Sequence, residues 1–455
     1  MKKNDEIQLN IMDMTAEGNG IGRFEGQAVF VPHTAVGDEA KVKIIKTAKN
    51  YAVGRLIELR KPAACRIPPD CPVCGPCGGC TYRHISYEAE CEIKRKRVND
   101  CLTRIGGLDV QVEEMIPSPK VDRYRNKAQF PVGLGADGQP ILGFYAPRSH
   151  RIVETEGCNL QPEIFDRLCE AFLAYLKEQK VSVYDPETGK GMVRHFYLRI
   201  GFATGQVMAC VVVAKGTLPN PNRLVERLKT AYPSITSVLV NRNEKPTNVI
   251  LGDQTTCLYG TDTIDDVLMD VPFTLSLHSF YQVNPAAVEK LFTRAAQYAN
   301  VGAGDTVVDL YCGAGAVGFC AGKQAGQLIG VEIVPQAVEN AKQNAKRIGR
   351  ENCEFLCMDA ADAAKELARR GVKPDVVFVD PPRKGCDPSV LHTITKDFAP
   401  KRVVYISCDP ATLARDAAIL KESGYQMEKA TAVDLFPRTP HVETTALFLR
   451  DINDQ

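Results

Sequence analysis

The chain has 455 residues, enough for about three domains, and 44% of them are hydrophobic. It holds no apolar run long enough to cross a bilayer, and its first residues lack the apolar core of a signal peptide, so we expect a cytoplasmic protein with no membrane association. The net charge of only +1 counts against one broad basic surface for nucleic acid, although basic residues gather locally at 94–97, 123–127 and 148–151.

The first 60 residues alternate short apolar segments with glycine-containing turns, of which Gly18-Asn19-Gly20 is one. Several short strands at this spacing predict a small five-stranded β-barrel. Residues 65–82 are too rich in Cys, Pro and Gly for a regular element, and a basic helix is expected after them, over 87–105. Residues 117–265 mix strands with one helix, at 162–178.

From about residue 270 the pattern becomes regular, with apolar strands alternating with helices. The expected strands are 306–311, 327–333, 354–358, 375–380, 402–408, 430–435 and 444–450. The expected helices include 335–348, 361–370 and 410–423. Strands that alternate with helices predict a doubly wound α/β sheet, and the last pair of strands favours a class I methyltransferase over a dehydrogenase.

A glycine turn follows the first of these strands, in Val307-Val308-Asp309-Leu310-Tyr311-Cys312-Gly313-Ala314-Gly315. It fits both a dinucleotide and S-adenosylmethionine, and Glu332 ends the next strand, where a ribose-binding acid is expected. The turn Asp380-Pro381-Pro382-Arg383 ends the fourth strand and faces the same crevice. Because such a turn is typical of methyltransferases, S-adenosylmethionine is the favoured cofactor.

Cys408 ends the fifth strand, and a helix N-terminus that follows should favour its thiolate. A single cysteine is usually a small buried hydrophobe, so its position carries the argument. Methylation of a pyrimidine at carbon 5 needs a thiolate that adds to carbon 6. Glu443, just before the last strand, is a candidate for the base that removes the hydrogen from carbon 5, and His441 is a rival.

The chain contains 17 cysteines, and four of them recur at every third residue, as Cys71, Cys74, Cys77 and Cys80. In a chain with no export signal, this spacing favours a metal site over disulfides. Zinc and an iron–sulfur cluster both use four thiolates, and the spacing does not separate them. The candidates for a remote ligand are Cys65, Cys91, Cys101 and Cys158.

Taken together, these motifs resemble the bacterial 23S rRNA (uracil-5-)-methyltransferases of the iron–sulfur-containing group, related to the tRNA enzymes that make 5-methyluridine. The resemblance covers essentially the whole chain. It implies a TRAM domain, an RNA-binding barrel, at residues 1–60, and a [4Fe-4S] cluster on Cys71, Cys77, Cys80 and Cys158, with Cys74 as an extra thiol. It divides the rest into a central domain (61–82 and 117–270) and a catalytic domain (83–116 and 271–455).

The segment Phe280-Tyr281-Gln282-Val283-Asn284 looks like the family's F-x-Q-V-N. The resemblance implies that Phe280 stacks on the target uracil, and that Arg125 helps to hold an RNA loop from which the base is flipped out. The implied cofactor residues are Gln282, Tyr311, Glu332 and Asp380, and the implied catalytic residues are Cys408 and Glu443. Two positions depart from the family pattern: many relatives have Asn in place of Asp409, and some have Asn in place of Ala316.

We therefore expect an S-adenosylmethionine-dependent RNA (uracil-C5)-methyltransferase whose substrate is 23S rRNA, with no obligate protein partner. The alternatives are the same chemistry on tRNA, a catalytically idle RNA-binding protein and a dinucleotide oxidoreductase. The tRNA relatives often lack both the barrel and the cysteine cluster, which favours rRNA.

Overall fold

The computed structural model describes residues 1–451, and the chain forms two compact units. The first unit comprises residues 1–97, 145–153 and 436–441. The second comprises residues 98–144, 154–435 and the chain from 442 on. Most of the expected central and catalytic segments thus share the second unit, whereas residues 61–97 lie in the first unit with the expected barrel. The division into three domains stays a prediction.

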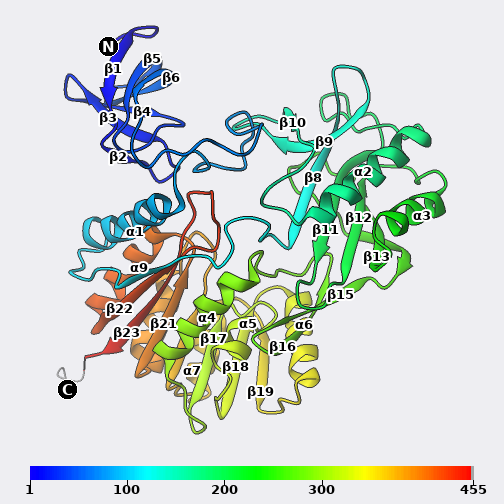
Figure 1. Cartoon of the computed structure of the whole chain (residues 1–455). Helices are drawn as coiled ribbons and strands as arrows, with labels where there is room; N and C mark the ends of the chain where they lie inside the picture. Colours follow the sequence, from blue (N-terminus) through cyan, green and yellow to red (C-terminus); the bar gives the residue numbers. More distant parts are fainter. Residues whose placement is uncertain (452–455) are drawn as a thin grey trace. The chain divides into compact units, whose positions relative to one another are not determined.

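The first unit contains one six-stranded sheet in the order β1-β5-β6-β4-β3-β2 (Figure 1). Its strands are β1 (Glu6–Asn10), β2 (Asp13–Met14), β3 (Gly20–Phe24), β4 (Gln27–Val31), β5 (Glu39–Thr47) and β6 (Tyr51–Lys61). Alternate side chains point inward, so that Ile7 and Leu9 pack with Val29 and Val42. The sheet has one strand more than the predicted five, because β2 is only two residues long and too short for its alternation to be visible in the sequence.

A second sheet lies in the middle of the chain, with the order β9-β8-β11-β12-β13-β14. Its strands are β8 (Lys127–Leu134), β9 (Pro140–Tyr145), β11 (Val193–Ile200), β12 (Val207–Val213), β13 (Ile235–Arg242) and β14 (Gln254–Gly260). The short β10 (Ile152–Glu154) follows β9 in the chain. Helices α2 (Glu163–Glu178) and α3 (Pro221–Ala231) contact each other and share a hydrophobic core with this sheet.

The eight-stranded sheet of the second unit has the order β19-β18-β17-β20-β21-β23-β22-β7. Its strands are β7 (Glu114–Ile116), β17 (Thr306–Leu310), β18 (Gln327–Glu332), β19 (Cys353–Cys357), β20 (Val376–Val379), β21 (Arg402–Ser407), β22 (Tyr425–Val433) and β23 (Glu443–Arg450). The strands from β19 to β21 are parallel, whereas β23 is antiparallel to both of its neighbours. A two-stranded hairpin, β15 (Thr263–Leu268) and β16 (Val271–Ser276), precedes this sheet in the chain.

Helices cover this sheet on both faces. The helices that follow the hairpin in the chain are α4 (Pro285–Ala299), α5 (Ala316–Cys320), α6 (Pro335–Arg347), α7 (Ala360–Arg369), α8 (Pro388–Thr393), the π-helix η1 (Ile394–Phe398) and α9 (Pro410–Glu422). Helix α1 (Tyr87–Arg104) runs from the first unit into the second. Residues of α7, α8 and α9 share one core with Val308 and Leu310 of β17. On the opposite face, Gly318 of α5 packs against Leu328 and Asp309. Within residues 1–451, no helix has the length and apolar character that a membrane crossing requires.

The carboxyl ends of β17, β18, β20 and β21 therefore meet at one edge of the sheet, as they do in doubly wound folds. The chain leaves these ends at Tyr311, Ile333, Asp380 and Cys408. The candidate site is built at this edge.

Candidate active site

The turn after β17 brings the backbone of Gly313 to the carboxylate of Glu332. The Gly313 N–H donates to Glu332 Oε2 (3.1 Å), and the Val334 N–H donates to Oε1 (2.9 Å). Gly313 and Gly315 have φ of 55° and 87°, a conformation that favours glycine. A Cβ added to Gly313 would meet nothing within 4 Å, so this turn faces open space. Ile333 and Val334 are 62% and 50% exposed, so a carboxylate lies beside apolar surface, which fits a ribose and its base.

Asp309 lies under this turn, with one carboxylate oxygen bonded and one free. Its Oδ2 accepts from the Gly318 N–H (2.8 Å), whereas its buried Oδ1 has no hydrogen-bond partner among the described residues. Burial, assisted by the charges of Asp380 and Glu332, raises the pKa of Asp309 to about 8. Buried polar atoms are normally hydrogen-bonded, so this oxygen is available to a donor of a ligand. The open glycine turn, Glu332 and this oxygen together fit S-adenosylmethionine.

Tyr311 directly follows β17 and is held in an unusual conformation. Its φ is 66°, which costs energy for a residue other than glycine and persists only where surrounding contacts fix it. Its hydroxyl and that of Tyr405 lie close enough to the buried thiol of Cys386 to lower its pKa, which burial raises to about 12. Tyr311, a predicted cofactor residue, is thereby tied to the loop that follows Asp380.

That loop is clamped to α9 by a buried carboxylate that the sequence analysis did not single out. Asp416 is fully buried, and its Oδ2 accepts from the Tyr405 hydroxyl (2.6 Å) and the Cys386 N–H (2.8 Å). Arg415 donates to Asp416 Oδ1 (2.8 Å) and to the carbonyl of Lys384 (3.0 Å). The contacts hold the loop with Asp380 and Arg383 against the helix that begins after Cys408.

Cys408 lies between the end of β21 and the start of α9, where its side chain is half-buried. Burial, with the charges of Glu443 and Asp380, raises the pKa of its thiol to about 11, while Arg383 opposes this shift. Burial and these acid groups thus oppose the thiolate that the following helix N-terminus is expected to favour. The Asp409 carboxylate caps this helix, accepting from the Ala411 N–H (2.9 Å).

This cap also explains the departure at position 409. The Oδ1 of Asp409 takes the place that an Asn side-chain oxygen can take equally well at a helix N-terminus. The groups with the largest effects on the pKa of Cys408 are Glu443, Asp380 and Arg383, and Asp409 is not one of them.

Glu443 is the first residue of β23, the antiparallel neighbour of β21. Ser407 pairs with Thr444, so one further step of this register places Cys408 opposite Glu443. The Glu443 side chain is 4% exposed, and burial together with the charge of Asp380 raises its pKa to about 8, while Arg383 opposes the shift. The rival base, His441, falls in the first unit.

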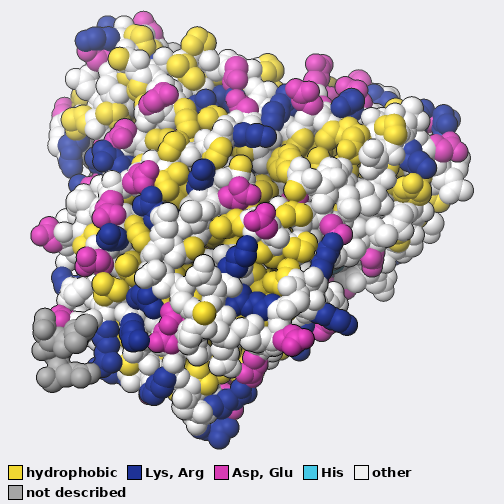
Figure 2. Space-filling view, turned by 60° about the horizontal axis from the view of Figure 1, so that its bottom comes forward, with side chains coloured by type: hydrophobic (Ala, Val, Ile, Leu, Met, Phe, Trp, Pro, Cys, Tyr) yellow, Lys and Arg dark blue, Asp and Glu magenta, His cyan; other side chains and the backbone are white. Residues whose placement is uncertain are grey.

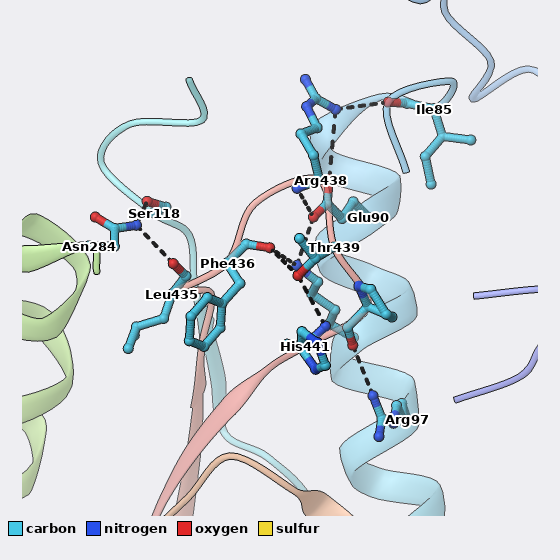
Figure 3. A network of polar contacts seen from close by, with 12 residues as sticks. Ile85, Glu90, Arg97, Ser118, Asn284, Leu435, Phe436, Arg438, Thr439 and His441 are labelled. Atoms are coloured by element: carbon cyan, nitrogen blue, oxygen red, sulfur yellow. Dashed lines mark hydrogen bonds and ion pairs between the residues drawn. The ribbon is translucent and has the colours of Figure 1, made fainter. Parts of the chain in front are cut away.

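The motif at 280–284 places an exposed aromatic ring beside buried polar anchors. Phe280 is 71% exposed. Gln282 is half-buried, and its main-chain carbonyl accepts a hydrogen bond from Asn126 Nδ2 (2.9 Å). Asn284 is buried, and its Nδ2 donates to Ser118 Oγ and to the Leu435 carbonyl, both at 3.0 Å (Figure 3). The predicted stacking residue is therefore accessible, and the last residue of the motif is structural.

The basic run at 94–97 is built into the first unit. Lys94 is buried and donates to Glu90 (2.7 Å) and to the carbonyl of Phe436 (3.2 Å). The Arg97 guanidinium donates to the carbonyl of Pro440 (2.8 Å), and the Arg438 N–H donates to Glu90 (2.7 Å) (Figure 3). Lys94 and Arg97 thus bind residues 436–441 to α1, although the sequence alone suggests that this basic run faces solvent.

The cysteine-rich loop lies in the first unit, whereas Cys158 falls in the second. The Cys74 N–H donates to the Cys71 carbonyl (3.1 Å), and burial raises the pKa of the Cys74 thiol, with further effects from Cys71 and Cys77. These three thiols are therefore neighbours. Among the described residues, however, no three Cys, His, Asp or Glu side chains converge in an arrangement that could hold a metal ion.

Comparisons with known proteins agree with this geometry. Residues 252–451 match the family described as tRNA (Uracil-5-)-methyltransferase, and residues 2–57 match the TRAM domain. An uncharacterized RNA methyltransferase of Clostridium tetani is 41% identical over 447 residues, 98% of this chain and 97% of the relative. Another, of Bacillus cereus, is 41% identical over 451 residues, 99% of this chain and 98% of the relative.

A solved structure is similar over nearly the whole chain. The tRNA (uracil-54, C5)-methyltransferase of Pyrococcus abyssi, in complex with S-adenosyl-L-homocysteine, has a TM-score of 0.78 and 27% sequence identity. The similarity covers 97% of this chain and 100% of that chain.

The chain belongs to the RNA uracil-5-methyltransferase family, with a TRAM domain at its N-terminal end. The expected class I methyltransferase fold, RNA (uracil-C5)-methyltransferase activity and use of S-adenosylmethionine are confirmed. The comparisons do not choose between rRNA and tRNA, and they carry no information on an iron–sulfur cluster.

Because Arg383 lowers the pKa of both Cys408 and Glu443, its removal should move the pH dependence of methyl transfer. In Arg383→Gln both pKa values rise, so the ascending limb of kcat/KM against pH should shift upward by roughly half a unit to one unit. Lys384→Gln removes the same charge one residue further on and serves as the control. An unchanged limb in Arg383→Gln, or an equal shift in both variants, would contradict this electrostatic role.

Proposed function

We propose that this enzyme methylates carbon 5 of a specific uridine in 23S rRNA, with Cys408 as nucleophile and Glu443 as base. The supporting observation is that a half-buried thiol and a buried carboxyl group lie on neighbouring strand ends and each responds to the same two charges, Asp380 and Arg383. A pair of titratable groups held at shifted pKa values in one crevice is typical of acid–base and nucleophilic chemistry.

Carbon 5 of uracil is a poor nucleophile until a thiolate adds to carbon 6. In the proposed reaction the Cys408 thiol first loses its proton, for which the ionised Glu443 is the adjacent acceptor, and that proton passes to solvent. The Cys408 sulfur then bonds to carbon 6, and the displaced electron pair makes carbon 5 nucleophilic. S-Adenosylmethionine, when bound, supplies the methyl group as an electrophilic sulfonium.

Glu443 then removes the hydrogen that remains on carbon 5. The electron pair of that C–H bond restores the double bond between carbons 5 and 6. The bond between carbon 6 and the Cys408 sulfur breaks, and the sulfur leaves with that bonding pair as a thiolate. The raised pKa of Glu443 makes it a stronger base than an ordinary carboxylate once it is ionised.

The other site residues have supporting roles in this proposal. Gln282, Tyr311, Glu332 and Asp380 hold the cofactor, with Glu332 at its ribose. Phe280 stacks on the uracil after it leaves the RNA stack, and Arg125 contacts the RNA backbone.

The substrate assignment has one rival with direct support. The relative from P. abyssi acts on uridine 54 of tRNA and is similar over 97% of this chain, a span that includes the barrel. The barrel therefore does not by itself favour rRNA. The rRNA assignment depends on the resemblance to the 23S rRNA group and on the cysteine-rich loop.

Methyl transfer to undermodified 23S rRNA and tRNA, tested in parallel with S-adenosylmethionine, decides between them. We expect 5-methyluridine in rRNA, located by nuclease digestion and mass spectrometry, and its loss in Cys408→Ala. Cys357→Ala removes an exposed thiol at the end of β19 and should retain activity. Methylation of tRNA alone would contradict the rRNA assignment and make tRNA the substrate. Methylation of neither RNA would favour a catalytically idle RNA-binding protein.

We also propose a [4Fe-4S] cluster on Cys71, Cys77, Cys80 and Cys158, with Cys74 outside it. The spacing of the cysteines and the proximity of the Cys71, Cys74 and Cys77 thiols support this, although the described side chains do not converge on a metal position. Anaerobically purified protein should contain about four iron and four sulfide per chain. Cys77→Ser should lose them and Cys74→Ser should keep them, whereas zinc lost equally in both variants would contradict the proposal.

A further inference from the structure

On the face shown in Figure 2, charges of both signs are mixed, with Lys and Arg interspersed among Asp and Glu. A site for an anion must therefore be sought in local groups of cations that lack acidic partners. One such group lies on the middle sheet, at the pair of strands β8 and β11.

Strand β11 is buried on both faces, but only one of them is apolar. Phe196, Leu198 and Ile200 belong to the core that the sheet shares with α2 and α3. His195, Tyr197 and Arg199 alternate with them and point to the opposite face, and all three are less than 9% exposed. His195 Nδ1 and the Tyr197 hydroxyl are buried and have no hydrogen-bond partner within residues 1–451.

This polar face continues onto β8, where the register sets two cations opposite each other. Lys127 pairs across the strands with Arg199, and neither Lys127 nor Arg125 has a carboxylate partner among the described residues. Burial, with the charges of Arg199 and Arg125, lowers the pKa of Lys127 to about 8. Like charges directly opposite in a sheet are destabilising, so the fold retains an arrangement that costs it stability.

Arg199, unlike Lys127 and Arg125, is hydrogen-bonded to the main chain. Its guanidinium donates to the carbonyls of Ser276 (2.8 Å) and Ser279 (2.7 Å), which fixes the segment leading directly to Phe280. Lys127 lies opposite Arg199, and Arg199 bonds the backbone just before Phe280. Lys127 therefore lies near the segment that carries the exposed ring of Phe280. Lys127 and Arg125 remain available for a ligand.

We propose that Lys127, together with Arg125, binds a phosphodiester group of the RNA next to the base on Phe280. Arg199 acts as a positioning residue for this segment. The bound phosphodiester reduces the electrostatic repulsion among Lys127, Arg125 and Arg199. This assignment rests on the proposed function, since it gives the RNA substrate of that site a specific backbone contact.

Lys127→Met tests it, because Met keeps the length of the side chain and removes the charge. Binding of a labelled oligouridine, titrated at several KCl concentrations, should weaken about tenfold, and the slope of log K against log[salt] should fall by about 0.7. Lys245→Met removes an exposed, ion-paired lysine on the same unit and should change affinity less than about twofold. The thermal midpoint of Lys127→Met should not fall, because a repulsion is removed.

The outcomes separate this inference from the proposed function. Unchanged affinity and salt slope in Lys127→Met, or no salt-dependent binding by the wild type, overturns the phosphate site. A lowered thermal midpoint with an unchanged salt slope assigns Lys127 a merely structural role and also overturns it. Lys127-dependent binding by a wild type that methylates no RNA supports the phosphate site and rejects the methylation.

Discussion

The site depends on the burial of acidic groups where several strands of one sheet end. Asp309, Asp380 and Glu443 are shielded from water, and burial raises their pKa values to about 8, 7 and 8. Burial and the charges of Glu443 and Asp380 raise the pKa of Cys408 to about 11, and Arg383 is the cation that opposes the shift at both Cys408 and Glu443. At neutral pH the Cys408 thiol is therefore protonated, and the acid groups around it would ionise more readily beside a ligand that carries positive charge, as a sulfonium does.

The fold supplies this environment through strand order and through one clamp. Neighbouring strands β17, β20 and β21 set Asp309, Asp380 and Cys408 at the same edge, and the antiparallel β23 adds Glu443 from the other direction. Asp416 and its partners hold the loop after β20 against α9. The positions of the acid, the thiol and the arginine thus depend on a buried hydrogen-bond network that lies behind the reacting groups.

Local patterns predict most of the strands and helices after residue 305 to within about one residue, although β22 begins at Tyr425, five residues before the expected 430, and α4 was not predicted. Strand β18 was expected at 327–333 and is found at Gln327–Glu332, because a buried parallel strand reads as a continuous apolar run. Helix α9 was expected at 410–423 and is found at Pro410–Glu422, because Asp409 and Pro410 mark its start. The motif residues could be placed for the same reason, since each follows a strand directly.

Features that depend on pairing between distant segments could not be predicted. The contact between Asp416, Tyr405 and Cys386 involves residues that are unremarkable in the sequence, and only the packing of α9 on the loop unites them. The opposition of Lys127 and Arg199 follows from strand register, for which 72 residues of separation leave no local signal. The raised pKa of Cys408 likewise reflects Glu443 and Asp380, which local reasoning about a helix N-terminus does not include.

The central claim is that Cys408 forms a covalent bond with the RNA and that Glu443 is needed to release it. The most direct measurement is to incubate Glu443→Gln with RNA and S-adenosylmethionine, denature the mixture and look for a protein–RNA adduct by mass spectrometry. The account predicts an adduct at Cys408 that carries the methylated base, and none when Cys408→Ala is added to Glu443→Gln. Normal turnover by Glu443→Gln, or an adduct at another residue, would contradict it.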